Sequence, residues 1–296
     1  MQASATLPPI VIDPTTFLKG HCTLPALPEV VGQIQSIIRD DDVAIEKVAH
    51  LISSDPALLA QTLKVVNSAY YGLPWEVTKA QVAISFLGLN EVHRMVLSLS
   101  VINTLSIVDK KEELSSFWHH SVYTAISTKH LVNRHSPGLN LEELWSAAVL
   151  HDIGKLLCLK LFPQHYKAVK AYAKEQGCLF SEAERALGIP ASALLGTLLC
   201  ERWTLPEKVK EACGRHTLHD LVSPDEEAPL TPFQRIITLG NLLTVLTTEW
   251  LAESKRLEIA DAVAKELRCQ DKDLEQLLQE VDGLRSDVEG LMGQFH

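Results

Sequence analysis

The sequence predicts an all-α protein of two packed helical bundles, and three observations support this fold class. Apolar residues recur at helical spacing along most of the 296 residues, the helix starts carry capping or proline signals, and no segment alternates like a strand. The polar stretch 109–116 is the best internal boundary. We expect an extended lead at 1–21, helical bundles at 22–108 and 109–250, and amphipathic C-terminal helices at 251–296.

Local signals set the limits of the N-terminal helices. Asp55 and Pro56 end one helix and begin the next, because Asp is a good N-cap and proline suits the first helical position. The run 91–105 is apolar on nearly every side, which indicates a buried helix and favours close packing of the two bundles. The alternative is a DNA-recognition helix bearing His93 and Arg94, which the surrounding apolar residues disfavour.

The second half of the chain consists of consecutive predicted helices, each with a cap or proline signal. Ser181 with Glu184 has the spacing of a capping box, and Thr231, Pro232 and Gln234 combine an N-cap, an N1 proline and a capping-box glutamine. The expected helices lie at 117–134, 140–161, 163–175, 182–187, 191–203, 207–216 and 232–250.

Apolar residues in the tail alternate in steps of three and four: Leu274, Leu277, Val281, Leu284, Val288 and Leu291. Two and a half heptads are too few for an autonomous coiled coil. This stripe therefore either packs on its own domain or contacts a partner, for example as a homodimer through 274–291.

Composition excludes several classes of protein. The chain has 27 Lys and Arg against 37 Asp and Glu, a net charge of -10, which argues against nucleic-acid binding by bulk electrostatics. The N-terminus lacks the pattern of a secretory leader, and no apolar stretch is long enough to span a membrane. The six cysteines show no CxxC spacing. We therefore expect a soluble cytoplasmic protein with reduced thiols.

The pair His151–Asp152 is the most informative feature of the sequence. It follows the apolar helical run that begins at Leu144, and we expect that helix to break at Gly154. Burying an unpaired imidazole and carboxylate costs several kcal/mol. The pair is therefore hydrogen-bonded as a packing feature, bound to a metal, or open to a cleft.

A second helix supplies a further candidate ligand. His119 and His120 differ by 100° around the helix 117–134, so only one of them can face a given site. His120 with His151 and Asp152 would give two imidazoles and a carboxylate, which suit Fe, Mn, Zn or Ni rather than Ca. Lys155 follows one turn after His151 and could place an ammonium beside the same pocket, where it would favour a phosphate.

Several ordered motifs together resemble the HDOD family, the HD-related output domain of bacterial signalling proteins within the HD superfamily of metal-dependent phosphohydrolases. The resemblance covers about residues 22–250 and implies an HD-domain-like second bundle. Its motifs are LPALPEV at 24–30, DPALLAQTLKVVNSAYYG at 55–72, AISFLGLNEVHRMVL at 83–97, FWHHS at 117–121, LHDIGKL at 150–156, ERWTLPEKV at 201–209 and GRH at 214–216.

The resemblance implies a role for five residues. His120 matches the helical metal ligand, and His151 with Asp152 matches the paired ligands. Lys155 matches the phosphate-facing lysine, and His216 matches a histidine of a later helix. Lys155 and His216 would be the catalytic candidates if the protein were active.

Three departures from the family pattern weaken this site. Asn241 stands where the superfamily has its last ligand, an Asp, and an amide carbonyl neither binds a transition metal as well nor neutralises its charge. Ser192 and Thr217 replace two histidines that the family often has. The resemblance therefore implies a divalent metal that is weakly held or absent, and no complete two-metal site.

Two classes of function remain open. The first is a signal-transduction output or regulatory module that contacts signalling proteins or senses a small phosphorylated ligand. The second is a metal-dependent phosphohydrolase acting on a nucleotide or cyclic nucleotide. We favour the first, because the resemblance implies signalling and Asn241 removes a ligand; nucleic-acid binding is the least supported interpretation.

Overall fold

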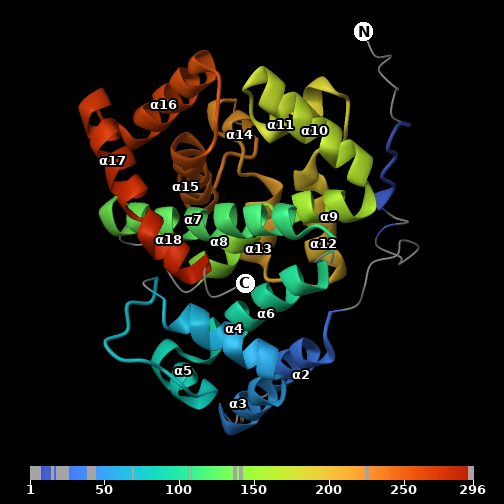
Figure 1. Cartoon of the computed structure of the whole chain (residues 1–296), viewed down its shortest axis with the longest axis vertical. Helices are drawn as coiled ribbons and strands as arrows, with labels where there is room; N and C mark the ends of the chain where they lie inside the picture. Colours follow the sequence, from blue (N-terminus) through green and yellow to red (C-terminus); the bar gives the residue numbers. More distant parts are fainter. Residues whose placement is uncertain are drawn as a thin grey trace. The chain divides into compact units, whose positions relative to one another are not determined.

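The computed structural model describes residues 8–14, 17, 27–38, 45–68, 70–105, 107, 109–135, 139, 143–223 and 227–292. Every regular element in these ranges is a helix, which confirms the all-α class (Figure 1). The expected lead at 1–21 lies mostly outside the described residues. No helix in the described part of the chain is both long and apolar enough to cross a membrane.

Contacts divide the chain into two units. Unit 1 comprises Met1–Leu24 and His151–Glu275, and unit 2 comprises Pro25–Leu150 and Gln276–His296. Each unit therefore combines segments that are distant in the sequence. The units are not the domains expected from the sequence, whose limits stay a prediction.

Unit 2 is built around one buried helix. The apolar run predicted at 91–105 forms α6 (Leu89–Leu105), whose side chains are buried from Met95 to Ile102. Arg94 does not project freely from it, because its guanidinium lies 3.9 Å from Glu91 and 3.4 Å from Glu143. The other helices of unit 2 are α2 (Glu29–Ile38), α3 (Ile45–Ser54), α4 (Pro56–Val66), α5 (Ala80–Leu87), α7 (Lys111–His135), α8 (Leu144–Leu150) and α18 (Arg285–Met292).

The predicted start of α4 is confirmed at atomic detail. A carboxylate oxygen of Asp55 accepts hydrogen bonds from the backbone N–H groups of Ala57 and Leu58, both at 3.0 Å, and Pro56 is the first helical residue. These two N–H groups have no partner within the helix, so the cap replaces bonds that would otherwise be missing.

The tail stripe forms two helices rather than one. The helix α17 (Asp271–Gly283) is followed by α18, with Leu284 between them. Four of the six apolar residues are buried, and the Leu291 side chain lies outside the described residues. In unit 2, α18 packs on α7, and the Tyr123 hydroxyl of α7 donates to the Val281 carbonyl at 2.8 Å. The tail is therefore packed within the chain, while the homodimer stays a prediction.

Unit 1 carries the remaining helices. The strongest predicted start is confirmed, because Thr231 caps α15 (Pro232–Thr248), with Pro232 first and Gln234 completing the capping box. None of the described cysteines forms a disulfide. The other helices are α9 (Ile153–Leu161), α10 (Pro163–Gln176), α11 (Phe180–Ala186), α12 (Ser192–Arg202), α13 (Glu207–Gly214), α14 (Leu218–Val222) and α16 (Glu253–Leu267).

Candidate metal and phosphate site

The pair His151–Asp152 occupies a turn between two helices. The helix α8 ends at Leu150 and α9 begins at Ile153, so the predicted break at Gly154 was wrong by two residues. Asp152 has the N-cap position of α9 but makes no side-chain bond to the backbone of that helix. Its carboxylate is therefore directed to other side chains.

Gly154 serves helix packing instead of ending a helix. A Cβ atom at this position would lie 1.9 Å from the Ser192 carbonyl oxygen and 2.7 Å from the Gly196 nitrogen. No side chain larger than hydrogen fits there, since both neighbours are backbone atoms. Gly154 thus allows the first turns of α9 and α12 to touch, which brings the start of α12 beside the pair.

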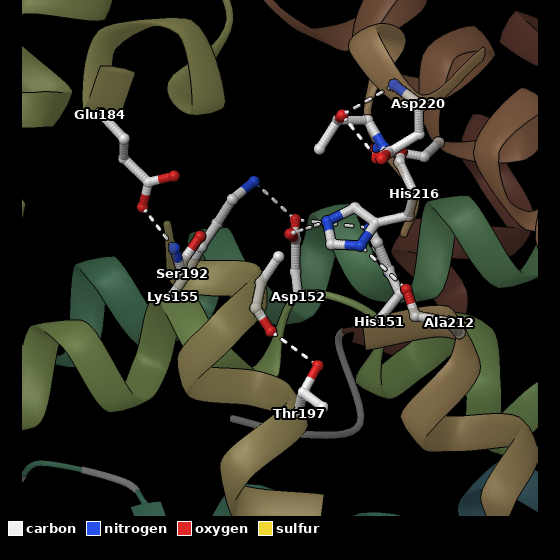
Figure 2. A network of polar contacts seen from close by, with 12 residues as sticks. His151, Asp152, Lys155, Glu184, Ser192, Thr197, Ala212, His216 and Asp220 are labelled. Atoms are coloured by element: carbon white, nitrogen blue, oxygen red, sulfur yellow. Dashed lines mark hydrogen bonds and ion pairs between the residues drawn. The ribbon is translucent and has the colours of Figure 1, made fainter. Parts of the chain in front are cut away.

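Asp152 is the centre of the polar cluster in Figure 2. Its Oδ1 lies 3.0 Å from His216 Nε2, and its Oδ2 lies 2.6 Å from the Lys155 ammonium and 3.4 Å from His151 Nε2. The His151 and Asp152 side chains are almost completely buried, at 0% and 2% exposure. A carboxylate buried to this degree depends on such partners to offset its lost hydration.

His216 is held in a defined orientation. Its Nδ1 lies 2.9 Å from the Ala212 carbonyl oxygen, so Nδ1 carries a proton and donates it. Its ring lies edge-on to that of His151, with centroids 4.9 Å apart at 87°. The hydrogen bond to Ala212 fixes Nε2 toward Asp152, as an outer hydrogen bond fixes a metal-binding imidazole.

Lys155 lies between the buried Asp152 carboxylate and the solvent. Its side chain is 24% exposed, and Nζ lies 5.2 Å from the centre of the Phe180 ring. Burial lowers the pKa of Lys155, but Asp152, Glu249 and Glu184 outweigh it, so the pKa is raised overall. The ammonium therefore stays charged where an anion could reach it.

Glu184 is a site residue that the sequence reasoning missed. The predicted capping box with Ser181 is wrong, because Glu182 accepts the Leu179 N–H at 3.0 Å in that role, and Glu184 instead accepts the Ser192 N–H at 2.9 Å (Figure 2). Burial raises the pKa of Glu184 to about 7, against the hydrogen bonds from Ser192 and the charge of Lys155. No sequence signal indicated this contact, because the fold alone brings the Ser192 N–H close to Glu184.

The three departures from the family pattern have different surroundings. The Asn241 side chain is buried and donates to the His216 carbonyl at 3.2 Å, while its Oδ1 accepts no hydrogen bond from the described residues. Ser192 is buried at the start of α12. Thr217 is the N-cap of α14 and bonds to Asp220, so its hydroxyl stabilises a helix end.

His120 and His119 belong to α7 in unit 2. Burial and then Arg285 of α18 lower the pKa of His119, and its ring lies 5.7 Å from that of Tyr123. His119 therefore lies on the face of α7 that carries Tyr123 and α18. His120 points about 100° away from it around the helix.

The donors of unit 1 suit a divalent transition metal. Two ligand atoms, each about 2.1 Å from one ion, lie about 3.4 Å apart at a tetrahedral angle. His151 Nε2 and Asp152 Oδ2 have this separation. The buried Asn241 Oδ1 is a further oxygen with no hydrogen-bond partner in the described ranges. The pair could therefore hold a metal.

Comparison with known proteins identifies the family. The model of the HDOD domain matches residues 24–218. The chain belongs to the HDOD family. Its match to an uncharacterized protein from Treponema pallidum (strain Nichols) is 25% identical over 208 residues, which is 70% of this chain and 40% of that relative. The chain thus spans less than half the length of the curated relative.

Solved structures share this HDOD fold. A protein from Shewanella amazonensis SB2B, named as a candidate phosphohydrolase, has a TM-score of 0.68 at 22% identity, over 95% of this chain and 98% of that one. A protein from Marinobacter aquaeolei VT8, named as a candidate signal transduction protein, has a TM-score of 0.66 at 21% identity, over 98% of this chain and 63% of that one. At these identities the likeness shows the fold alone.

Proposed function

We propose that this HDOD protein is a bacterial signal-transduction output or regulatory module that keeps a partial HD metal site. The site would sense a small phosphorylated ligand, or support contacts with signalling proteins, instead of hydrolysing a substrate efficiently. The name of the Marinobacter protein of similar fold favours this class.

The observation that carries the proposal is the amide at Asn241. It lies in the buried part of α15 and donates to the backbone of His216. Two neutral imidazoles and one carboxylate leave a divalent ion with a net positive charge, which a carboxylate at this position would neutralise. The protein therefore holds an ion more weakly than a complete HD site would.

We propose His120 as the second imidazole. In unit 2, α7 packs along α8, and α8 ends one residue before His151. Because His151 follows Leu150 directly in the chain, it stands at the end of a helix that α7 flanks. The partners of His119 on the face toward α18 support His120 as the member of the pair that turns to the site.

The roles of the residues follow from their contacts. His120, His151 and Asp152 would hold Fe, Mn, Zn or Ni, and such an ion would supply Lewis-acid polarisation of a phosphoryl oxygen when bound. The His216 ring, anchored through Nδ1 to the Ala212 carbonyl, lies against Oδ1 of Asp152, and Lys155 presents an ammonium to an anionic ligand.

The alternative is a metal-dependent phosphohydrolase acting on a nucleotide or cyclic nucleotide. The observation that favours it is the Lys155 ammonium, which lies against Asp152 and has a route to solvent. The name of the Shewanella protein of similar fold agrees with this alternative.

Metal analysis of protein purified without chelator, followed by a nucleotide hydrolysis screen with added Mn²⁺ or Fe²⁺, tests the proposal. We expect little or no turnover. Asn241→Asp should tighten Mn²⁺ binding about tenfold, because a charged oxygen replaces a neutral one. Asn103→Asp is the matched control, since Asn103 is exposed on α6 and bonded to Gln61.

Two results would contradict these expectations. An Asn241→Asp protein with unchanged Mn²⁺ affinity would show that Asn241 does not face the metal position. Robust turnover by the unmodified protein, abolished by His151→Ala or Asp152→Ala, would replace the regulatory proposal with the phosphohydrolase.

A further inference from the structure

The two oxygens of Asp152 have partners of different kinds. Oδ1 lies 3.0 Å from an imidazole nitrogen of His216, which is itself anchored to the Ala212 carbonyl. Oδ2 lies 2.6 Å from the Lys155 ammonium and 3.4 Å from His151 Nε2 (Figure 2). The oxygen that has metal-ligand spacing to His151 is thus the one that already carries the ammonium.

An ammonium and a divalent cation compete for that oxygen. Both are positive, and the carboxylate is buried at 2% exposure, where like charges at contact distance repel strongly. The pairing of Lys155 with Asp152 is also reinforced by helix geometry, because the N-cap residue of α9 and the residue three positions later lie on the same side of the helix start. An ion at His151 and Asp152 therefore has to displace Lys155.

Solvent offers the Lys155 ammonium an alternative to its position at Asp152. Its side chain is 24% exposed, whereas those of His151, Asp152 and His216 are at most 5% exposed. An anion arriving from solvent therefore meets the ammonium first. A tetrahedral oxyanion offers several acceptors for it, and the face of the Phe180 ring, whose centre lies 5.2 Å from Nζ, gives the ammonium a second attractive contact beside Asp152.

We propose that Lys155 is a built-in competitor for the metal position at Asp152, and that an oxyanion which draws the ammonium away raises the affinity of the site for a divalent cation. The inference rests on the proposed metal site and adds its regulation. Because coupling between two ligands is reciprocal, the metal raises the affinity for the oxyanion by the same factor. The site then responds to the two ligands together more strongly than to either one.

The test measures Mn²⁺ binding from the electron paramagnetic resonance signal of the free ion, so it needs no activity. Sulfate serves as the oxyanion, at constant ionic strength. In the unmodified protein, saturating sulfate should tighten Mn²⁺ binding about tenfold. Lys155→Gln should bind Mn²⁺ about tenfold more tightly without sulfate, and sulfate should then have no effect. Lys155→Arg keeps the positive charge, so this variant should still bind Mn²⁺ weakly in the absence of sulfate.

Lys208→Gln is the matched control. Lys208 forms an i, i+3 ion pair with Glu211 at 2.9 Å, the same spacing as Lys155 with Asp152, but on α13. It should leave both the Mn²⁺ affinity and the sulfate effect unchanged. Asp152→Asn should abolish binding and shows that the signal reports this site.

The outcomes separate this inference from the metal site itself. If the unmodified protein binds Mn²⁺ through Asp152 but sulfate has no effect, or Lys155→Gln binds no more tightly, the competitor role is wrong and the metal site stands. If no variant binds Mn²⁺, both are wrong. The sulfate arm uses the unmodified protein, so a Lys155→Gln protein that fails to fold still leaves a decisive measurement.

Discussion

Asp152 in unit 1 and Glu91 in unit 2 are both buried carboxylates, but their neighbours differ in kind. Glu91 accepts the Tyr71 hydroxyl at 2.7 Å, and its second oxygen lies 3.9 Å from the Arg94 guanidinium. Asp152 lies among two imidazoles and a part-exposed ammonium. Both groups lose hydration on burial, and the type of partner separates a structural carboxylate from one that suits a ligand site.

Tyr71, which donates to Glu91, keeps one protonation state. Burial and then Glu91 raise the pKa of Tyr71, so the phenol remains a neutral donor. Lys129 lies 4.2 Å from the centre of the Tyr70 ring, beside the same cluster. Imidazoles, in contrast, are common metal ligands. The Glu91 cluster is therefore suited to stability and the Asp152 cluster to binding.

Alanine substitution of the two carboxylates gives the largest expected effects. Glu91→Ala should lower the free energy of unfolding by about 3 kcal/mol, because it leaves the Tyr71 hydroxyl without its acceptor and removes one of the two carboxylates beside Arg94. Asp152→Ala should lower it by about 2 kcal/mol, because Lys155 can turn toward solvent, but it should abolish metal binding. Urea unfolding and Mn²⁺ titration measure the two quantities. Equal losses of stability would remove the distinction between the clusters.

The pH dependence of stability tests the unit 1 cluster through Glu184. Burial raises its pKa from 4.5 to about 7, so the folded state binds the proton more tightly than the unfolded state. The contribution of Glu184 to the free energy of unfolding is therefore full below pH 4.5 and is lost as pH rises through about 7. It amounts to at most about 3 kcal/mol.

Glu184→Gln should flatten this part of the pH profile. The glutamine carbonyl can still accept the Ser192 N–H, and no charge has to form in the buried position. Urea unfolding at pH 5 and pH 8 measures the slope for both proteins. A variant that keeps the wild-type slope would assign the pH dependence to other groups.

Local chemistry made much of the fold predictable. Asp55 with Pro56, and Thr231 with Pro232 and Gln234, begin helices through interactions within four residues, and the structure confirms both starts. The helix class follows from signals of this range. The paired His151 and Asp152 were also evident, because an imidazole next to a carboxylate is unusual in an apolar run.

Features of the site that depend on distant residues could not be predicted. Gly154 was interpreted as a helix break, yet its role depends on Ser192 and Gly196 of another helix. Glu184 was interpreted as a cap because the competing partner, the Ser192 N–H, is brought close only by the fold. Periodicity and capping rules contain no information on such contacts.

The smallest expected effect comes from Glu280 of unit 2, a carboxylate whose pKa is lowered, whereas that of Glu184 is raised. Hydrogen bonds from Arg134, His130 and Gln276 lower the pKa of Glu280 from 4.5 to about 2. The stabilisation from this group is full above pH 4.5 and is lost as pH falls toward 2. Glu280 is part-exposed, so Glu280→Gln should cost about 1 kcal/mol or less at neutral pH.

The effect should be local because Glu280 joins α17 to α7 through His130 at 3.0 Å and Arg134. Glu280→Gln should therefore speed amide hydrogen exchange in α17 while leaving α9 and α12 unchanged. Glu275→Gln is the matched control, since Glu275 is exposed on the same helix. Equal exchange in the two variants would mean that the buried apolar residues Leu277 and Val281 hold α17 without help from the ion pair. In that case fixed charges would contribute to unit 2 only where they are buried, as at Glu91.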